Sequence, residues 1–350
     1  MESKDSSIKD NEQEQSKLND SINKLRNIKC SFLIPIIFEY IPKRIALGIT
    51  QYNKNLQKLI NVNINNYREY VKNKYLSIKL EIIPMENKYG DFIHINSRDK
   101  KYYHIYFNDN IKNEIKKTCL NERDKVSKIN IIIDYKVKSF SYLFMFCSCI
   151  KSINIKNFKN NITNVSGMFF ECSSLKELNL KYFNTDNVTD MRAMFSGCVS
   201  LTELNLKYFN TNKETNMSGM FCGCSSLKEL NIKYFNTKNV NNMNCMFLGY
   251  SSLNKLDLNH FYTNNAIDMN WMFYERSSLK ELNINNFNTK KVTNMNSMFF
   301  GCSSLKELNL NNFNTNKVID MRGMFSKCSN ELKVIIKNKY KNFKEEAFKK

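Results

Sequence analysis

The chain has 350 residues, of which 42% are hydrophobic, so it contains enough apolar material for a substantial core and is not disordered throughout. Its formal net charge of +20 is spread along the sequence, and lysine and glutamate are often adjacent. This distribution makes nucleic acid an unlikely partner class and favours a solvated, mixed-charge surface.

The N-terminal part of the chain differs from the rest. Residues 1–25 are polar, predict a disordered tail and contain no apolar segment of the kind found in secretory signals. Residues 26–125 predict a small region that is helical first and mixed α/β afterwards. Apolar residues recur at near-helical spacing over residues 30–60, and Pro35 and Pro42 divide this stretch into two or three short helices. Three alternating segments then predict strands, at residues 75–83, 91–95 and 102–107.

The helical stretch weakly resembles an F-box, an element that docks a substrate adaptor onto a ubiquitin ligase. The interpretation we favour is an ordinary small helical domain or a cap on the segment that follows. The longest apolar run, residues 32–38, is too short to span a bilayer, so no membrane span is predicted. Eleven cysteines in a chain without a signal segment predict reduced thiols and a cytoplasmic protein.

The remainder of the sequence repeats with a period of 26 residues. The unit reads V-x-x-M-x-x-M-F-x-x-C-S-S-L-x-x-L-N-L-x-x-F-N-T, and about eight units occupy residues 126–336. One phenylalanine of each unit marks the period, with 25 residues between the first two and 26 between the others: Phe144, Phe169, Phe195, Phe221, Phe247, Phe273, Phe299 and Phe325. A single unit of this size cannot bury its own apolar residues, so we expect neighbouring units to stack.

Two apolar patterns follow one another within each unit. Met191, Met194 and Phe195 are apolar at positions i, i+3 and i+4, which predicts a short helix of two or three turns. Leu204 and Leu206 alternate about one polar residue, which predicts a short strand. Stacking would turn each apolar position into a continuous buried column.

Both ends of the repeats depart from the consensus. Val126, Ile129 and Ile131 keep the spacing of the strand leucines and predict the first strand of the repeats. Residues 337–350 are basic and predict a helical C-terminal cap. Because an end unit has fewer neighbours, replacing Phe325 should destabilise the protein less than replacing Phe247.

The segment SGMFFECSSLKELNLKYFNTDNVTDMRAMF and its copies, such as SSLKELNINNFNTKKVTNMNSMF, resemble the 26-residue repeats of BspA-like leucine-rich-repeat proteins over residues 137–336. The resemblance implies an α/β fold, a right-handed solenoid with short parallel strands and short helices. It also implies a role in adhesion or protein interaction, and it makes the cell surface the alternative location.

No catalytic or cofactor-binding motif is present in the sequence, and a side chain repeated in every unit is not a unique catalytic group, so we expect no enzyme and no cofactor. His94 and His104 have no cysteine or carboxylate at ligand spacing, so no metal site is predicted. Six cysteines fall in one column and are expected to be buried structural thiols: Cys147, Cys172, Cys198, Cys224, Cys302 and Cys328.

The polar positions of the predicted strands should point away from the core and form regular rows that could bind a macromolecule. The alternative is that these rows only keep the protein soluble. The candidate partner-binding residues are Glu177, Asn179, Glu203, Asn205, Glu229, Asn231, Lys255, Asp257, His260, Glu281 and Asn283. We expect His260 to be exposed, and Trp271 lies near the unit in which the rows are least regular.

The leading hypothesis is a non-enzymatic interaction or scaffolding protein that binds a protein partner through its strand face. An F-box-like ubiquitin-ligase adaptor and a surface adhesion protein are the alternatives. The sequence does not identify the partner, because consensus residues specify the scaffold and not its ligand.

Overall fold

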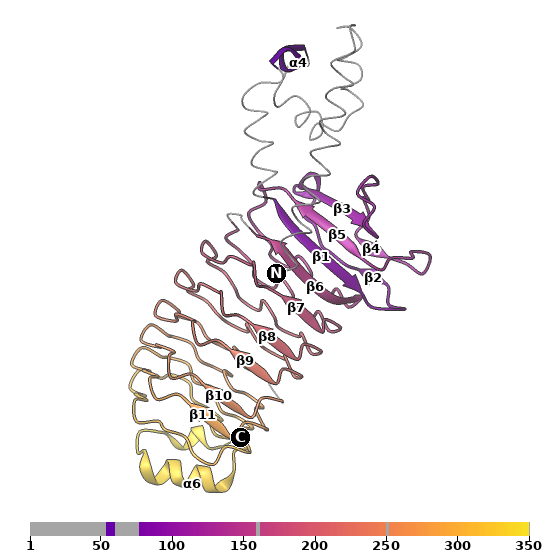
Figure 1. Cartoon of the computed structure of the whole chain (residues 1–350). Coiled ribbons are helices and arrows are strands. Elements are labelled where there is room, and N and C mark those ends of the chain that lie inside the picture. Colours follow the sequence, from indigo (N-terminus) through magenta and orange to yellow (C-terminus); the bar gives the residue numbers. More distant parts are fainter. Residues whose placement is uncertain (1–53, 60–76, 159–161, 250–251, 350) are drawn as a thin grey trace, which may run out of the picture. The chain divides into compact units, whose positions relative to one another are not determined.

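The computed structural model describes residues 54–59, 77–158, 162–249 and 252–349. The chain divides into two compact units, Met1–Leu76 and Ser77–Lys350 (Figure 1). The described part of the first unit is the helix α4, Lys54–Leu59. The tail predicted for residues 1–25 and most of the F-box-like stretch lie outside the described residues.

The second unit begins with a five-stranded sheet in the order β3-β5-β1-β6-β7. Alternating apolar residues of these strands are buried. Its strands are β1 (Ile78–Pro84), β3 (Tyr103–Phe107), β5 (Ile129–Ile133), β6 (Ile150–Asn157) and β7 (Glu177–Asn179). A second pair consists of β2 (Gly90–Asp91) and β4 (Cys119–Leu120), and a 3-10 turn, η1 (Lys100–Tyr102), precedes β3. The predicted strands at 75–83 and 102–107 are therefore found as β1 and β3.

Two strand predictions need correction. The segment expected to be the first strand of the repeats forms β5, but β5 lies antiparallel between β3 and β1. The first strand that pairs in parallel with its successor is β6, whose Ile153 lies opposite Leu178 of β7. Of residues 91–95, only Asp91 lies in a strand, although Phe92 and Ile93 are buried. Apolar alternation identifies a buried segment, but it does not identify the partner of a strand.

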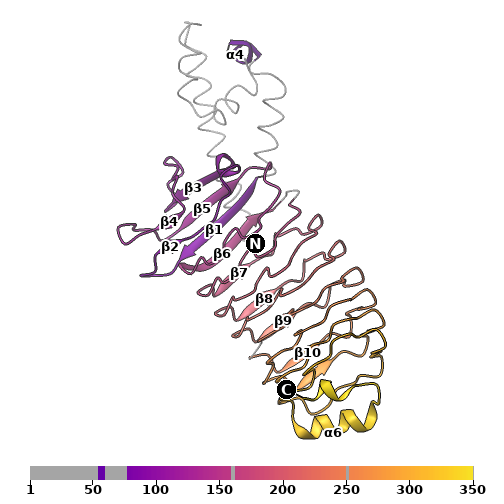
Figure 2. The ribbon, with the colours of Figure 1, turned by 180° about the vertical axis from the view of Figure 1, so that it is seen from behind.

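Five of the repeats contribute a strand of three residues, and these strands follow one another along one side of the second unit (Figures 1 and 2). After β7 they are β8 (Glu203–Asn205), β9 (Glu229–Asn231), β10 (Lys255–Asp257) and β11 (Glu281–Asn283). β8 pairs with β9 and β10 pairs with β11, in parallel and with an offset of 26 residues, as in Leu204 opposite Leu230 and Leu256 opposite Leu282. The described repeats are thus short strands and turns in a repeating arrangement, with few helices.

The short helix predicted in each unit is not formed, because the Met-x-x-Met-Phe segment is a series of turns. The N–H of Met194 donates to the carbonyl of Met191 (3.2 Å), three residues before it. The N–H of Ala193 instead donates to the carbonyl of Ser218 in the next unit (2.9 Å). Ala193 has a φ of +51°, a left-handed conformation that interrupts any helix. Consecutive turns place residues i, i+3 and i+4 on one side, as a helix does, but leave alternate N–H groups free to join neighbouring units.

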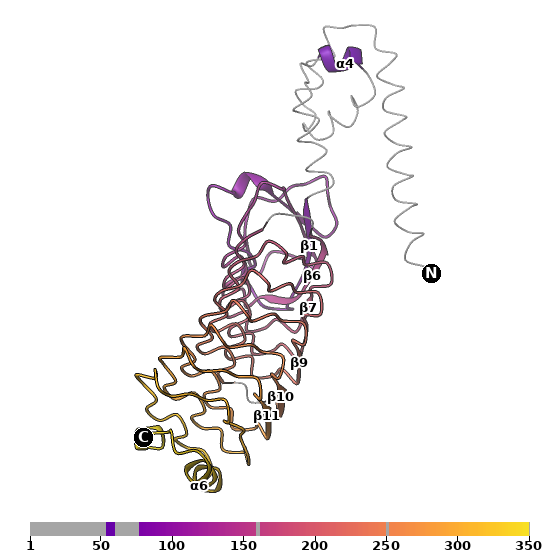
Figure 3. The same cartoon turned by 90° about the vertical axis from the view of Figure 1, so that its left-hand side faces the viewer.

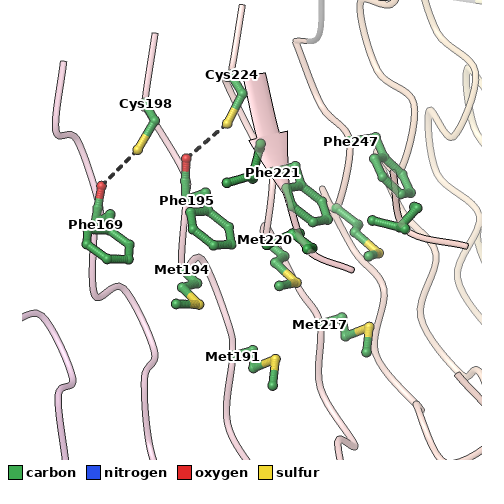
Figure 4. Packing of buried hydrophobic residues seen from close by; sticks show 14 of the residues in the cluster. Phe169, Met191, Met194, Phe195, Cys198, Met217, Met220, Phe221, Cys224 and Phe247 are labelled. Carbon is green, nitrogen blue, oxygen red and sulfur yellow. Dashed lines mark hydrogen bonds between the residues drawn. The ribbon is translucent and has the colours of Figure 1, made fainter. Parts of the chain in front are cut away.

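The apolar columns form the core (Figure 4). Phe195, Phe221 and Phe247 are fully buried, and successive rings stack with their centroids 5.8 Å apart. The cysteine column is buried as predicted, and its thiols have a structural role. The Sγ of Cys198 donates to the carbonyl of Phe169 in the preceding unit (3.1 Å), and Cys224 repeats this contact with Phe195 (3.0 Å). Each of these carbonyls also accepts the N–H of the residue three positions later in its own turn, so the thiol supplies a second hydrogen bond that joins two units.

A column of buried threonines also joins the units. The Oγ1 of Thr237 accepts a hydrogen bond from the N–H of Tyr262 (2.8 Å) and donates one to the carbonyl of the same residue (3.0 Å). Thr237 is fully buried. Each hydroxyl therefore satisfies both backbone groups of one residue in the following unit. The same arrangement is found at Thr185, Thr211, Thr263 and Thr289.

Replacing Thr237 with valine should lower the free energy of unfolding by about 1–3 kcal/mol, because it leaves a buried N–H and a buried carbonyl of Tyr262 without a partner. Urea unfolding would measure the loss. Thr237→Ser keeps the hydroxyl and serves as the control. A valine variant as stable as the wild type would contradict the structural role of this column.

The C-terminal end is covered by its own segment (Figure 3). The helix α6, Asn330–Lys339, begins before the predicted cap at residues 337–350 and covers only its first residues. Ser329 caps it, since its side chain accepts a hydrogen bond from the N–H of Leu332 (3.1 Å). A 3-10 turn, η2 (Glu345–Ala347), follows.

Candidate functional site

Ten of the eleven candidate residues lie on the strands β7 to β11, at the two positions that flank the central leucine. Their side chains point away from the core, and all but Asn283, which is half-buried, are exposed. The exposure follows from the period of two along a strand, because burial of the central leucine turns its neighbours outward. The strand face is defined here as the outer side of β7–β11.

One row of the strand face carries repeated negative charge. Glu203 of β8 lies directly opposite Glu229 of β9 in the parallel register, and Glu177 occupies the same position of β7. Within the described residues, no ion pair or hydrogen bond engages these three carboxylates. We call Glu177, Glu203 and Glu229 the acidic row. Like charges opposite each other on paired strands repel and destabilise the pairing of the strands.

On the next two strands, β10 and β11, the charges at the same position neutralise each other in an ion pair. Lys255 of β10 takes the position of the glutamate, and its Nζ lies 2.6 Å from the Oε2 of Glu281 in β11. Both side chains are about two-thirds exposed. The pKa of the Lys255 ammonium is raised by the hydrogen bond to Glu281. The strand face therefore has an unpaired acidic part over β7–β9 and a paired part over β10–β11.

The asparagine row of the strand face has a structural role that sequence reasoning missed. The Oδ1 of Asn205 accepts a hydrogen bond from the N–H of Lys207 (3.1 Å), and Asp257 makes the same bond with Asn259 (3.0 Å). Asparagine and aspartate favour this turn, which ends each strand. Asn179, Asn231 and Asn283 make the equivalent bonds. The Asx-turn preference was the available signal, since each of these residues directly precedes a turn.

His260 and Trp271 lie outside the strand face. His260 was expected to be exposed but is half-buried, and its Nε2 is 2.8 Å from the carbonyl of Ile232 in the preceding unit. Burial lowers the pKa of its imidazole. Trp271 lies in the turn segment, with 43% of its surface exposed and its Nε1 donating to the Oδ1 of Asn296 (3.1 Å). These residues therefore do not extend the rows formed by the glutamates and asparagines.

The structure brings carboxylates to His104 that its sequence neighbourhood did not reveal. Its Nδ1 is 3.3 Å from the Oε1 of Glu114, and its Nε2 is 3.7 Å from the Oδ1 of Asp134. The pKa of the His104 imidazole is raised, mainly by its interaction with Asp134. Glu114 raises this pKa further, whereas burial lowers it. Within the described ranges, no group of three or more His, Cys, Asp and Glu side chains is placed to hold a metal ion.

A buried glutamate interrupts one apolar column. Glu214 stands 26 residues after Val188 and 26 before Val240, and it is fully buried, as they are. Its Oε2 accepts a hydrogen bond from the N–H of Met191 (3.0 Å), while its Oε1 has no partner among the described residues. Burial raises the pKa of this carboxyl to about 8, against the opposing effect of the Met191 hydrogen bond. Alignment of the repeats would have shown the exception, which the sequence analysis did not single out.

Glu214 also lies where one bridge is missing from a row of bridges between units. Isolated bridges join neighbouring repeats along one edge, as at Asn164–Asp190 and Asn216–Asn242. Among the described residues of this edge, no bridge joins Asp190 to Asn216. The Glu214 carboxyl takes the Met191 N–H, a donor that in most other units bonds to a backbone carbonyl of the next unit.

No helix of the described residues is long and apolar enough to cross a membrane. Comparison with curated proteins and with solved structures gives no match. Two overlapping segments, residues 138–256 and 246–345, match the family described as Mycoplasma protein of unknown function, DUF285. The two matches together include all the repeat strands from β6 to β11 as well as α6, and they span more than half of the chain. The chain therefore belongs to the DUF285 family.

Proposed function

We propose that this chain is a non-enzymatic protein-interaction or scaffolding protein. Its repeats form a right-handed solenoid of the leucine-rich-repeat type, similar to BspA-like proteins, and its strand face binds a protein partner. Parallel pairing with an offset of 26 residues and continuous phenylalanine columns support the solenoid. A stack of this kind presents an extended regular surface, the usual binding surface of repeat proteins.

The acidic row carries the proposal. Glu203 and Glu229 face each other in register and have no neutralising partner among the described residues, whereas β10 places Lys255 at the same position, opposite Glu281 of β11. A partner with basic side chains would relieve this repulsion on binding, and its approach would be steered by charge. We therefore expect a protein partner that presents lysine or arginine to β7–β9, with binding that weakens as salt is added.

The test is a charge reversal in the full chain. Glu203→Lys combined with Glu229→Lys should abolish capture of the partner in a pull-down, followed by identification and direct titration of the captured protein. Glu86→Lys combined with Glu122→Lys is the matched control, because both residues are exposed, lie away from the strand face and change the net charge equally. Circular dichroism would establish that both variants are folded.

Capture by the control variant together with loss by the strand-face variant supports the proposal. Equal capture by the two variants, or equal loss, would rule out the acidic row as the binding surface. Capture that is insensitive to salt would also contradict a charged interface of this kind.

A further inference from the structure

A groove of about 530 Å³ lies at the C-terminal end of the repeats, away from the strand face. It is formed by the turn that follows β11, the equivalent turn of the next unit, the segment after α6 and Asn264 of the unit before. Its volume is within the range of pockets that bind small ligands, roughly 300–1,000 Å³. The side chains that matter most to the argument are Asn286, Asn288, Asn312, Asn314 and Asn342, and we call this cavity the asparagine groove.

The lining is polar and almost uncharged. Eight of its twelve residues are asparagines, and Lys290 is its only charged residue. Phe287 is fully buried and Phe313 is 5% exposed, so their side chains present little apolar surface to the groove. A ligand in this groove would therefore be held mainly by hydrogen bonds.

The internal hydrogen bonds fix the orientation of several amides. The Oδ1 of Asn288 accepts from the N–H of Lys290 (3.2 Å), and the Oδ1 of Asn314 accepts from the N–H of Asn316 (2.9 Å). The Nδ2 groups of Asn288 and Asn314 are thereby left as donors toward a ligand.

Two other amides are oriented the opposite way. The Nδ2 of Asn312 donates to the carbonyl of Asn285 (2.7 Å), and the Nδ2 of Asn342 donates to the carbonyl of Phe313 (2.9 Å). The Oδ1 atoms of Asn312 and Asn342 are thereby left as acceptors. The groove offers both donors and acceptors, held in place by the backbone.

This combination selects one ligand chemistry. An anion would use the donors only, and a metal ion the acceptors only. A hydroxyl both donates and accepts, so a ligand with many hydroxyls can use every free group of the lining. We propose that the asparagine groove binds a neutral oligosaccharide.

The position of Asn286 is taken by His260 in the adjacent unit and by tyrosines in the three units before it. These tyrosines are Tyr182, Tyr208 and Tyr234, each more than half exposed. The flat apolar face of a tyrosine ring can pack against the C–H face of a sugar, while its hydroxyl remains available for hydrogen bonding. A sugar chain that leaves the groove along these units would meet those rings.

The experiment measures binding of maltohexaose, cellohexaose and chitohexaose to the full chain by isothermal titration calorimetry. Asn288→Asp and Asn314→Asp keep the acceptor that each turn requires and replace the ligand-facing donor with an oxygen. Each should weaken binding of the recognised sugar about tenfold, the loss of one good hydrogen bond. Asn236→Asp is the matched control, because Asn236 makes the same turn bond with Lys238 (3.1 Å) two units before Asn288 and does not line the groove.

Saturable binding of a neutral hexasaccharide that is weakened by the groove variants and retained by Asn236→Asp supports the proposal. No binding of the three sugars at millimolar concentration overturns it, as does binding that both groove variants leave unchanged. A heparin hexasaccharide is the charged comparison. If it alone binds, the lysines and not the amides are responsible, and the proposal fails. None of these outcomes bears on the strand face, whose residues are not part of the groove.

Discussion

Replacing Glu214 with valine should raise the free energy of unfolding by roughly 3–5 kcal/mol at about pH 9. The carboxyl is fully buried in a column that holds valine or alanine in the neighbouring units, and one of its oxygens has no partner among the described residues. The wild-type protein must bury a charge there at high pH, whereas valine restores apolar packing. Urea unfolding of both proteins at matched pH measures the difference.

The effect depends on pH in a defined direction. The pKa of Glu214 is about 8 in the folded chain against an ordinary value of 4.5, so between these values the folded state holds one more proton than the unfolded state. The free energy of unfolding should therefore fall by about 1.4 kcal/mol for each pH unit as the pH rises through this window. Below pH 4.5 and above pH 8 this contribution should be constant.

Glu214→Gln separates charge from packing. The amide oxygen can still accept the N–H of Met191, but the side chain cannot ionise. This variant should lose the pH-dependent part of the stability that Glu214 contributes. If its stability changed with pH just as that of the wild type does between pH 4.5 and 8, Glu214 would not be the titrating group.

Phe247→Ala should lower the free energy of unfolding by about 3–5 kcal/mol, the usual cost of removing a large buried aromatic side chain. Phe247 is fully buried, stacks on Phe221 and Phe273 with 5.8 Å between centroids, and also contacts Phe261. Its loss would leave a cavity bounded by residues of three units. An unchanged free energy of unfolding, measured with urea, would contradict the assignment of this phenylalanine column to the core.

Phe325→Ala should cost about as much, contrary to the expectation from its place in an end unit. The structure covers this ring on its outer side, where Phe343 and Phe348 each lie 5.3 Å from it. Its N–H donates to the carbonyl of Ala347 (2.7 Å). Hydrogen exchange should distinguish the two variants, because the loss of protection should stay near the C-terminal end in Phe325→Ala and spread over central units in Phe247→Ala.

The 26-residue spacing was sufficient to predict which residues form the buried columns and which strand positions are exposed. It did not distinguish a short helix from a series of turns, because both place Met191, Met194 and Phe195 on one side. The difference depends on the Ala193 N–H, which bonds to another unit, and a local pattern contains no information about that partner. The partner of β5 and the exposure of His260 were missed for the same reason.

The candidate site was predicted in outline only. The alternation about Leu204 correctly predicted that Glu203 and Asn205 are exposed. It did not distinguish the role of the glutamate row from that of the asparagine row. Asn205 is engaged in the turn to Lys207, whereas Glu203 faces another glutamate. Assigning a role to each row required the register between strands, which a single sequence does not contain.

The threonine and cysteine contacts have a consequence for how the length of this chain can change. Each hydroxyl or thiol contacts the backbone of an adjacent unit at a constant offset along the sequence, as Thr211 does with Asn236 and Cys224 does with Phe195. Duplication or loss of one whole unit would therefore recreate the same contacts at the new junction, while an insertion much shorter or longer than a unit would shift the contacts of the columns at that junction. Gene rearrangements that preserve this period could lengthen or shorten the protein without any new packing solution, as expected for repeat proteins stabilised by nearest-neighbour contacts.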